Sequence, residues 1–376
     1  MPIASHLATP SLRALVPDQT WPEGPSVPSA ALRDRVVLVS GAGGSLGRQL
    51  VERLARHPVR AILAVDTSEH ALVQGQEEWS RTASETTTEI VPVLADLRHP
   101  PDRRRCLAAG PTAAPDLVIH AAAYKHVPFL EDRPIAAAQN NLLATVDWAR
   151  ACQEAGVRRF AFVSTDKVVA PISVMGQTKR WAEQWLRASG GTVAPPVSIV
   201  RLCNLFGSRG SVVPAALRRL RAGEAVPVTH PDMQRWMMAP PDAQQVLLRS
   251  ITEPPGTTVP QACVEISIPT LIRRLIRHVR PDADPTAWME ETAPRPGERL
   301  QEPRWGPEEQ PTDPTTDGHQ HLSCPSPPAW VQTALDPLRQ ACIDGDAEAA
   351  RRLLQRVART APAVATANEG EGVHTP

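Results

Sequence analysis

Residues 164–179, which read STDKVVAPISVMGQTK, contain two of the three lysines in the chain. The chain has 40 lysine and arginine residues, and all except Lys125, Lys167 and Lys179 are arginine. A buried lysine can lose its proton and act as a base, whereas arginine stays charged. We therefore interpret the retained lysines as groups that do chemistry. The single tyrosine of the sequence, Tyr124, precedes Lys125.

Asp166 and Lys167 are adjacent in this segment, and a carboxyl beside an amine forms an acid–base pair whose pKa values the environment can tune. Such a pair suits removal of a proton from a carbon next to a carbonyl, with loss of a neighbouring hydroxyl. Ser164 and Thr165 precede the pair and are predicted to face the substrate with it. An ordinary Asp–Lys surface turn is the alternative interpretation, but it does not explain why a lysine-poor chain keeps lysine there.

A glycine-rich segment, GAGGSLG, lies between a short apolar run (35–40) and an amphipathic segment. This order predicts a strand, a turn and a helix. The three spaced glycines would permit the tight turn, let the backbone approach a pyrophosphate and let the helix pack close to the strand. N–H groups at the start of the helix would then bind the phosphates. The residues predicted to form this phosphate site are Gly41, Gly44, Ser45, Leu46 and Gly47.

Carboxylates follow the next two apolar runs. Asp66 comes directly after 61–65, 19 residues beyond the last glycine of the motif. At this spacing it can accept both hydroxyls of an adenosine ribose, which favours NAD over NADP. Asp96 follows 90–94, and with Leu97 it could meet the adenine. The alternatives are a helix cap for Asp66 and an ordinary turn for Asp96.

Two further apolar runs, 116–120 and 159–164, complete an alternation of strands and helices. This alternation predicts an α/β fold with a Rossmann-like, doubly wound parallel sheet, whose ligands bind at the carboxyl ends of the strands. Small residues after the first run would let the chain pass close to a flat cofactor, and a lysine on the helix after the second could hold the nicotinamide ribose. The cofactor residues predicted here are Ala121, Ala122, Ala123, Asn141 and Lys179.

The composition sets limits on the class of protein. The net charge is zero, so nothing indicates a nucleic-acid partner. No apolar run approaches ~20 residues, so no membrane span is predicted. The six cysteines show no ligand spacing, and His126 and His230 are isolated, so we predict reduced thiols, a cytoplasmic protein and no metal. The predicted divisions are a Pro-rich arm (1–33), an NAD-binding domain with the catalytic segment (34–205), a smaller substrate-binding subdomain with C-terminal helices (206–360) and a disordered tail (361–376).

Several stretches resemble one family within the extended short-chain dehydrogenase/reductase superfamily. That family is the CapD-like polysaccharide biosynthesis proteins, with the UDP-N-acetylglucosamine 4,6-dehydratases. The resemblance extends from about residue 36 to about 299, and more faintly to about 354. The stretches are HAAAYKHVPFLEDRP (120–134), STDK (164–167), VMGQTKR (174–180), GSRGSVVP (207–214), VTHPDMQRWMM (228–238) and RPGE (295–298).

The resemblance implies NAD as cofactor, a UDP-sugar as substrate and an elimination of water. The sugar would be oxidised at carbon 4, with Asp166 or water accepting the hydroxyl proton and Thr165 hydrogen-bonding the oxygen there. Lys167 would then remove the carbon 5 proton, and Asp166 would protonate the hydroxyl that leaves carbon 6. Most of the superfamily has tyrosine four residues before the active-site lysine. This chain has Met175, whose thioether cannot accept the proton, and so resembles a Met branch without its membrane half.

The UDP half is expected between the two domains. The residues involved would bind phosphate oxygens, clamp the pyrophosphate and hold the uridine ribose. They are Asn204, Ser211, Val212, Arg235, Arg295 and Glu298, with Lys125 as a residue that either contacts the substrate or caps the site. For each arginine, a solvated surface position is the alternative.

The sequence departs from the family pattern at a few positions, and other functions stay open. The departures are Ala170, Ile172, Ser173 and Gln301, which lie near the substrate segment. One alternative is an epimerase or 4-keto reductase with the same fold. Another is a non-catalytic nucleotide-binding homologue. A homo-oligomer is a further expectation from the resemblance.

Overall fold

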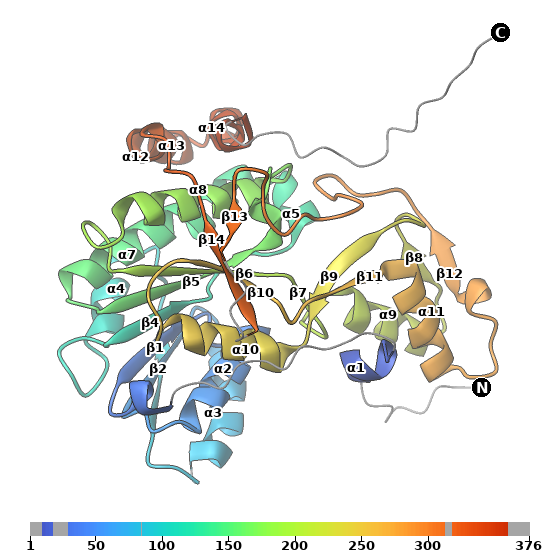
Figure 1. Cartoon of the computed structure of the whole chain (residues 1–376), viewed down its shortest axis with the longest axis horizontal. Helices are drawn as coiled ribbons and strands as arrows, with labels where there is room; N and C mark the ends of the chain where they lie inside the picture. Colours follow the sequence, from blue (N-terminus) through green and yellow to red (C-terminus); the bar gives the residue numbers. More distant parts are fainter. Residues whose placement is uncertain (1–9, 18–28, 84, 313–317, 360–376) are drawn as a thin grey trace.

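The computed structural model describes residues 10–17, 29–83, 85–312 and 318–359, which form a larger and a smaller lobe (Figure 1). Within these residues, the larger lobe has a nine-stranded sheet in the order β13-β14-β10-β6-β5-β4-β1-β2-β3. From β10 to β3 neighbouring strands are parallel, whereas β14 is antiparallel to both β10 and β13. The predicted Rossmann-like, doubly wound sheet is therefore confirmed. Its strands are β1 Val36–Ser40, β2 Ala61–Asp66, β3 Glu89–Leu94, β4 Leu117–His120, β5 Arg159–Thr165, β6 Val197–Leu202, β10 Thr257–Pro260, β13 Gln310–Pro311 and β14 His319–Ser323.

Helices cover both faces of this sheet, which explains why its strands read as continuous apolar runs. All residues of β1 are buried, with Val37 and Val39 in the core on one face and Val36 and Leu38 in the core on the other. The helices on the first face are α2 Ser45–Ala55, α3 Glu69–Ala83 and α10 Pro240–Ser250. Those on the second are α4 Pro100–Leu107, α5 Val127–Glu131, α6 Pro134–Ala137, the π-helical η2 Ala138–Leu143, α7 Ala144–Glu154 and α8 Val174–Ser189.

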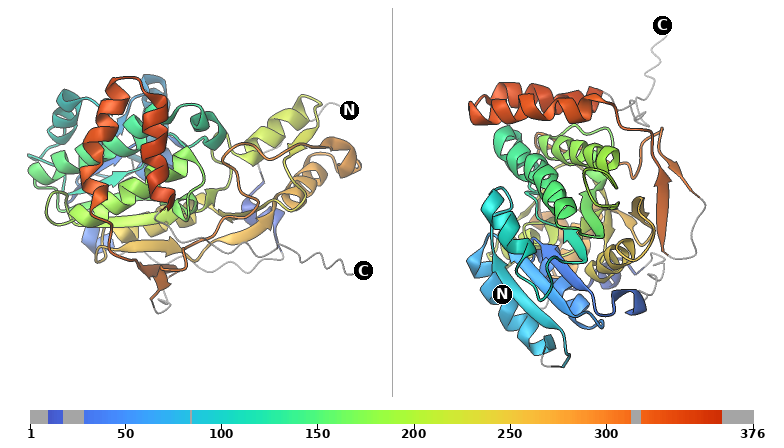
Figure 2. Two further views of the ribbon diagram at one scale, coloured as in Figure 1. Left: turned by 90° about the horizontal axis from the view of Figure 1, so that it is seen from above. Right: turned by 90° about the vertical axis from the view of Figure 1, so that its left-hand side faces the viewer.

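A third layer lies outside α8. It consists of α12 Trp330–Thr333, α13 Leu335–Ile343 and α14 Ala347–Arg359, which lie together over the larger lobe (Figure 2). Trp181 of α8 donates its Nε1–H to the carbonyl of Val331 at 2.9 Å. Buried side chains of Leu338 and Leu354 continue the same core. The C-terminal helices, predicted as part of the substrate-binding segment 206–360, therefore pack on the larger lobe.

The smaller lobe has its own hydrophobic core and two small sheets, β11-β9-β7 and β12-β8. Leu12 and Leu15 of the predicted arm belong to this core, in a short helix against α11. A 3-10 turn, η1 Ser29–Leu32, lies near the end of the arm. Arm residues 1–9 and 18–28, like the predicted tail 361–376, lie outside the described ranges. The elements of this lobe are α1 Leu12–Leu15, β7 Asn204–Leu205, α9 Val212–Arg221, β8 Val226–Val228, β9 Gln234–Met238, β11 Val264–Ser267, α11 Ile268–Val279, η4 Pro285–Trp288 and β12 Met289–Glu291.

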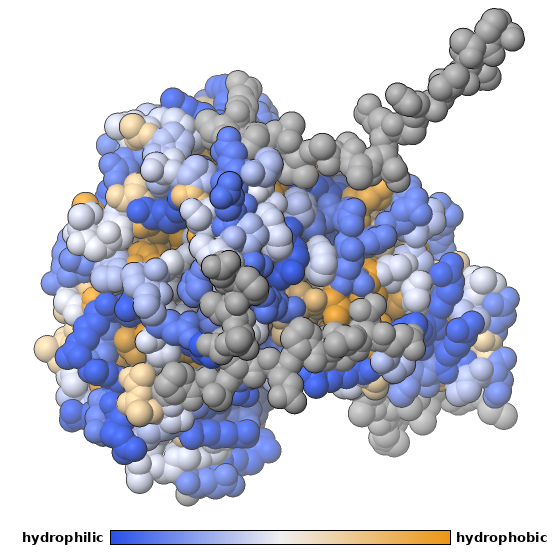
Figure 3. All heavy atoms as spheres, in the orientation of Figure 1, coloured by the Kyte–Doolittle hydropathy of each residue, from blue (hydrophilic) through white to orange (hydrophobic). Residues whose placement is uncertain are grey.

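The chain beyond residue 205 crosses between the lobes more than once. The segment 206–360, predicted as a subdomain with C-terminal helices, builds the smaller lobe but also returns α10, β10, β13 and β14 to the large sheet. None of the helices in the described ranges is both long and apolar enough to cross a bilayer. The face seen in Figure 3 is mainly hydrophilic, with small separate apolar patches.

Candidate active site

The glycine segment forms a close-packed turn between β1 and α2. Gly41 has φ +75°, which L side chains rarely adopt, and a Cβ there would lie 2.7 Å from the backbone nitrogen of Ala122. A Cβ on Gly47 would lie 2.1 Å from the carbonyl oxygen of Gly41. Gly44 is the N-cap of α2, and no side chain caps the helix. The uncapped N–H groups and the close turn fit the phosphates of a dinucleotide. Leu46 packs against the core.

Asp66 at the end of β2 faces this turn. Its Oδ2 accepts from the backbone N–H of Gly43 at 2.9 Å, and its Oδ1 accepts from that of Ser68 at 2.9 Å. Ser68, rather than Asp66, caps α3 by accepting from Ala71. The carboxylate therefore lies beside the phosphate turn, where the ribose of NAD is predicted.

Asp96 is committed to its own turn. Arg98 contacts its carboxylate in a bidentate manner, with Nη2 at 2.6 Å from Oδ2 and Nε at 3.0 Å from Oδ1. Hydrogen bonding from Arg98 holds the pKa of Asp96 below its ordinary value. Leu97 is buried in the core. These contacts favour the alternative interpretation, in which Asp96 stabilises an ordinary turn, over the prediction that it binds the adenine.

Asn141 fixes the loop after β4 that contains Ala121, Ala122 and Ala123. It is fully buried in the π-helical segment, where a continuous α-helix was expected. Its Oδ1 accepts from the N–H of Tyr124 at 2.8 Å, and its Nδ2 donates to the carbonyl of Tyr124 at 2.9 Å. Asn141 therefore acts on the loop and, through it, on the space beside Gly41.

The predicted acid–base pair is present at the carboxyl end of β5, in the 3-10 turn η3 Asp166–Val168. Asp166 is 3% exposed, and its Oδ1 accepts from Thr165 Oγ1 and from Lys167 Nζ, both at 2.9 Å. Lys167 Nζ also lies 3.3 Å from Oδ1 of Asn204. Oδ2 of Asp166 is buried and has no hydrogen-bond partner within the described ranges. This oxygen is free to accept a proton from a bound molecule or to deliver one.

A second carboxylate, Glu302, lies in the electrostatic field of the pair, and the sequence analysis missed it. Burial alone would lower the pKa of Lys167, but the charges of Asp166 and Glu302 together raise it. Burial raises the pKa of Glu302, more than the charge of Lys167 lowers it. Glu302 is 5% exposed and follows the RPGE stretch, which was the available signal for it. Lys167 is therefore protonated, with Asp166 in direct contact and the charge of Glu302 acting on it as well.

Met175 and Lys179 lie on the buried face of α8, as their spacing predicted. Each is 5% exposed. Nζ of Lys179 lies 4.0 Å from the centre of the Phe162 ring, and burial lowers the pKa of Lys179 to about 7. Burial, together with the charge of Lys179, also lowers the pKa of His120 to about 3. His120 is therefore neutral and hydrogen-bonds to Ser40 at 2.7 Å beneath the site.

Asn204 and Arg235 reach the acid–base pair from the smaller lobe. Asn204 bridges the lobes, because its Oδ1 meets Lys167 and its Nδ2 donates to the carbonyl of Trp236 at 2.9 Å. The charge of Arg235 acts on both Lys167 and Glu302. Its Nη1 donates to the carbonyl of Leu300 at 3.1 Å.

The remaining predicted substrate residues lie around the loop that follows β7 and the RPGE turn. Arg295 and Glu298 bind each other, with Nη2 to Oε1 at 2.6 Å, so they are not free clamps as they stand. Ser211 caps α9 without a side-chain bond, its Oγ is buried without a partner in the described ranges, and Val212 begins the helix. Lys125 Nζ lies 3.4 Å from Ser208 Oγ.

The departure at Ala170 coincides with backbone strain. Ala170 has φ +41°, in the left-handed region that a side chain disfavours. Arg299, directly after the RPGE stretch, donates to the carbonyls of Val169 and Ala170. Ile172 is exposed, while Ser173 is buried and caps α8 by accepting from Gly176 at 3.1 Å.

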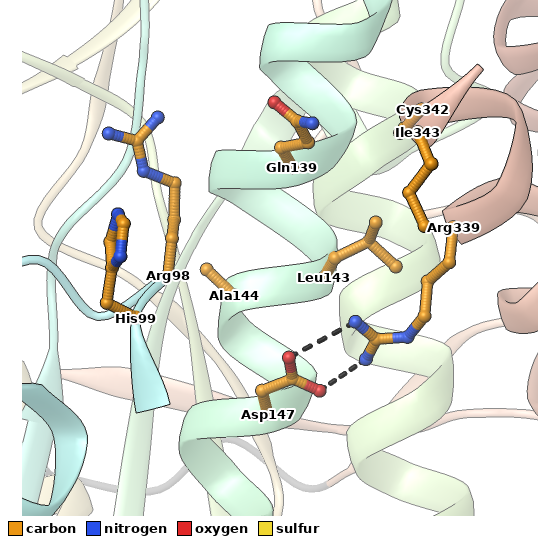
Figure 4. A pocket seen from close by; sticks show the side chains of 9 residues that line it. All are labelled: Arg98, His99, Gln139, Leu143, Ala144, Asp147, Arg339, Cys342 and Ile343. Carbon is orange, nitrogen blue, oxygen red and sulfur yellow. Dashed lines mark hydrogen bonds and ion pairs between the residues drawn. The ribbon is translucent and has the colours of Figure 1, made fainter. Parts of the chain in front are cut away.

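The pocket in Figure 4, of about 390 Å³, lies elsewhere, between η2, α7 and α13. Two of its charged groups pair with each other, Asp147 with Arg339 at 3.2 Å, and Arg98 pairs with Asp96. We therefore assign it no role. Its lining residues are Arg98, His99, Gln139, Leu143, Ala144, Asp147, Arg339, Cys342 and Ile343.

The fold and this site define an extended short-chain dehydrogenase/reductase. The chain belongs to the polysaccharide biosynthesis protein family, whose model matches residues 37–321. It is 34% identical over 277 residues to the capsular polysaccharide biosynthesis protein CapD of Staphylococcus aureus. The aligned residues make up 73% of this chain and 45% of CapD. The chain thus spans about half the length of this curated relative.

Solved structures share the fold at low identity. The structure of Pen from Bacillus thuringiensis has a TM-score of 0.68 at 23% identity, over 79% of this chain and 90% of that one. The dTDP-glucose 4,6-dehydratase DesIV from Streptomyces venezuelae has 0.61 at 20% identity, over 71% and 87%. The UDP-glucose 4-epimerase from Thermotoga maritima has 0.60 at 18% identity, over 71% and 88%. These similarities establish the fold, which dehydratases and epimerases share.

Proposed function

We propose that this chain is an NAD-dependent nucleotide-sugar 4,6-dehydratase. Its substrate would be UDP-N-acetylglucosamine or a similar UDP-N-acetylhexosamine, and its product a 4-keto-6-deoxy sugar for polysaccharide biosynthesis. The observation that carries the proposal is the buried ion pair of Asp166 and Lys167 at the end of β5, one turn before a helix that presents Met175 and Lys179. The membership of the chain in the polysaccharide biosynthesis family supports the class of product.

The cofactor site fits NAD on three observations. The glycine turn leaves no room for side chains at Gly41 and Gly47, the start of α2 is uncapped, and Asp66 faces the turn. Bound NAD would supply a reversible hydride acceptor. We assign Lys179, which is buried on α8 against the Phe162 ring of β5, to the nicotinamide ribose.

The proton steps can be balanced with the residues present. When the sugar is oxidised at carbon 4, its hydroxyl proton needs an acceptor, and we assign this role to Glu302, which is 5% exposed and whose charge acts on Lys167. Lys167 can act as a base only after its own proton passes to Asp166 through the 2.9 Å hydrogen bond. Lys167 then takes the carbon 5 proton, and Asp166 protonates the hydroxyl leaving carbon 6 as water.

The later steps restore the starting state. Hydride returns to carbon 6, Lys167 returns a proton to carbon 5, and Lys167 is recharged from Glu302. No step uses Met175, whose thioether cannot accept a proton. The replacement of tyrosine by Met175 is what assigns the proton transfers to Asp166, Lys167 and Glu302. Of the predicted phosphate ligands, Arg235 would bind the UDP phosphates, whereas both ends of the Asn204 amide are engaged, by Lys167 and by the carbonyl of Trp236.

Mass analysis of the product distinguishes the candidate functions. Purified protein would be incubated with NAD and UDP-N-acetylglucosamine, and NADH would be followed by absorbance. Loss of one water without net NADH supports the dehydratase. A stereoisomer of unchanged mass would instead indicate an epimerase, and NAD binding without turnover would indicate a non-catalytic homologue. A Lys167→Ala variant that dehydrates at the full rate would contradict the role of this lysine.

A further inference from the structure

A compact cluster of metal-ligating side chains lies at the edge of the large sheet, separate from every residue of the proposed active site. It consists of Glu253, His319 and His321. Each residue offers one ligand atom, and the three atoms lie within 4.8 Å of one another. We propose that these side chains bind a divalent transition-metal cation of the zinc type. This site is independent of the proposed dehydratase activity.

The secondary structure brings the three residues together. His319 and His321 are two apart on β14, so their side chains project from the same face of the strand. β14 pairs antiparallel with β10, with His319 opposite Pro260 and His321 opposite Thr258. Glu253 lies in the turn between α10 and β10, so its carboxylate meets this face from the helix side. A cation here would connect the antiparallel edge of the sheet to the end of α10.

The geometry at the carboxylate suits a ligand that binds through one oxygen. Arg249 Nε donates to Oε1 of Glu253 at 2.6 Å, whereas Oε2 lies 3.0 Å from Nε2 of His319. Arg249 therefore orients one oxygen of Glu253, and hydrogen-bonding groups behind metal ligands commonly have this role. The other oxygen faces His319. The two imidazole rings are 5.1 Å apart and nearly perpendicular, so the second ring also borders this space.

The ligand set determines the class of metal. Two imidazoles with one carboxylate match the donor set of zinc sites with three protein ligands and one open position. Imidazole nitrogen favours zinc and similar transition ions over magnesium and calcium, which prefer oxygen alone. His319 is 2% exposed, whereas Glu253 and His321 are partly exposed, so one ligand is buried and the site stays accessible from solvent. No metal was predicted from the sequence, because Glu253 lies far from His319 and His321 in the chain and two histidines alone do not make a ligand set.

The competing account is an ordinary ion pair between His319 and Glu253, supported by Arg249. This account gives the His321 ring no polar partner in the described ranges beyond a marginal 3.5 Å approach to Thr258 Oγ1. Substitution of His321 therefore separates the two accounts: a metal site loses a ligand, whereas the ion pair stays intact.

The test uses tag-free full-length protein that has been stripped of metal with a chelator. Zinc would be titrated in competition with a chromophoric chelator, and cobalt(II) would be added separately to record its visible spectrum. We expect one equivalent of zinc per chain, a cobalt spectrum of low coordination number and a higher unfolding temperature with zinc. His321→Ala and Glu253→Gln are each expected to weaken zinc binding by at least about tenfold.

The matched control is His70→Ala, which removes an exposed histidine on α3 and is expected to leave zinc binding unchanged. Circular dichroism would establish that each variant is folded. The proposal is overturned if the unmodified protein binds no stoichiometric zinc or gives no such cobalt spectrum. Equal zinc affinity in His321→Ala and the unmodified protein would overturn it as well. The first two readouts need no variant, so they decide the matter even if a variant does not fold.

Discussion

Replacing Lys179 with methionine is expected to stabilise the cofactor-free protein at pH 7. Lys179 is 5% exposed and packs its ammonium against the Phe162 ring. Burial lowers its pKa from 10.5 to about 7, and the charge of Glu183 offsets only part of this effect. Folding at pH 7 must either bury the charged amine of Lys179 or remove its proton, and both cost free energy. Methionine has a similar length and no charge, so the substitution removes this cost.

The sign and size of the effect follow from the two pKa values. Between pH 7 and 10.5 the unfolded chain holds the lysine proton and the folded chain releases it, so stability rises with pH. The destabilisation by Lys179 is absent above pH 10.5, the pKa of the lysine in the unfolded chain. It grows as the pH falls towards about 7, the pKa of Lys179 in the folded protein. A shift of about 3.5 pKa units corresponds to a cost on the order of 5 kcal/mol near pH 7, and about 2 kcal/mol at pH 9.

Urea denaturation of both proteins at pH 7 and pH 9, without NAD, measures this difference. The stability advantage of Lys179→Met is expected to shrink by about 2 kcal/mol between the two pH values. Lys125→Met is the comparison variant, because Lys125 is exposed near the same site, although burial and the charge of Arg209 also lower its pKa. Its stability relative to the unmodified protein is expected to change with pH in the same direction as that of Lys179→Met, but by less. An advantage of Lys179→Met that is constant with pH, or that grows as the pH rises, would refute the reasoning.

Three further substitutions test other parts of the structure. Ala170→Gly is expected to raise the free energy of unfolding by about 1 kcal/mol, because glycine relieves the left-handed strain at φ +41°. Arg201 Nη1 and Glu309 Oε2 form a buried ion pair at 2.6 Å. Glu309→Gln is expected to lower the free energy of unfolding by about 3 to 5 kcal/mol, because it removes one of the carboxylates that balance the buried charge of Arg201. Glu302→Gln is expected to reduce kcat for dehydration by about a hundredfold, because a proton acceptor is lost.

Each of these substitutions has a control or a contradicting outcome. Glu308→Gln changes an exposed neighbour of Glu309 and is expected to leave stability unchanged. Contacts with Arg201 hold the pKa of Glu309 below its ordinary value, so its stabilisation is present near neutral pH and is lost in acid. A stability loss that did not shrink in acid would contradict this account. No gain from Ala170→Gly would show that Arg299 relieves the strain. An unchanged kcat in Glu302→Gln would remove Glu302 from the proton steps.

The sequence was sufficient for the first five strands of the sheet and for the residues that local order brings together. Short apolar runs predicted β1 to β5, because buried parallel strands have a strong local pattern. The pair of Asp166 and Lys167 is adjacent in the chain, so no folding was needed to predict that they meet. Lys179 was placed by its helical spacing from Met175.

The sequence was insufficient where distant segments meet. Glu302 and Glu309 lie in a stretch without periodicity, so nothing local indicated that both are buried, one beside Lys167 and the other against Arg201. Arg295 and Glu298 were predicted to contact the substrate, but the structure pairs them with each other. The π-helical turn at Asn141 likewise depends on its hydrogen bonds to Tyr124, which spacing does not reveal.

Turnover of UDP-N-acetylglucosamine in deuterium oxide tests the central claim most directly. If Lys167 removes the carbon 5 proton and water is lost from carbon 6, the product has lost one water and carries one deuterium at carbon 5, and NADH does not accumulate. Both features should disappear in Lys167→Ala. A product of unchanged mass without deuterium would contradict the assignment of Asp166 and Lys167 as the pair that eliminates water.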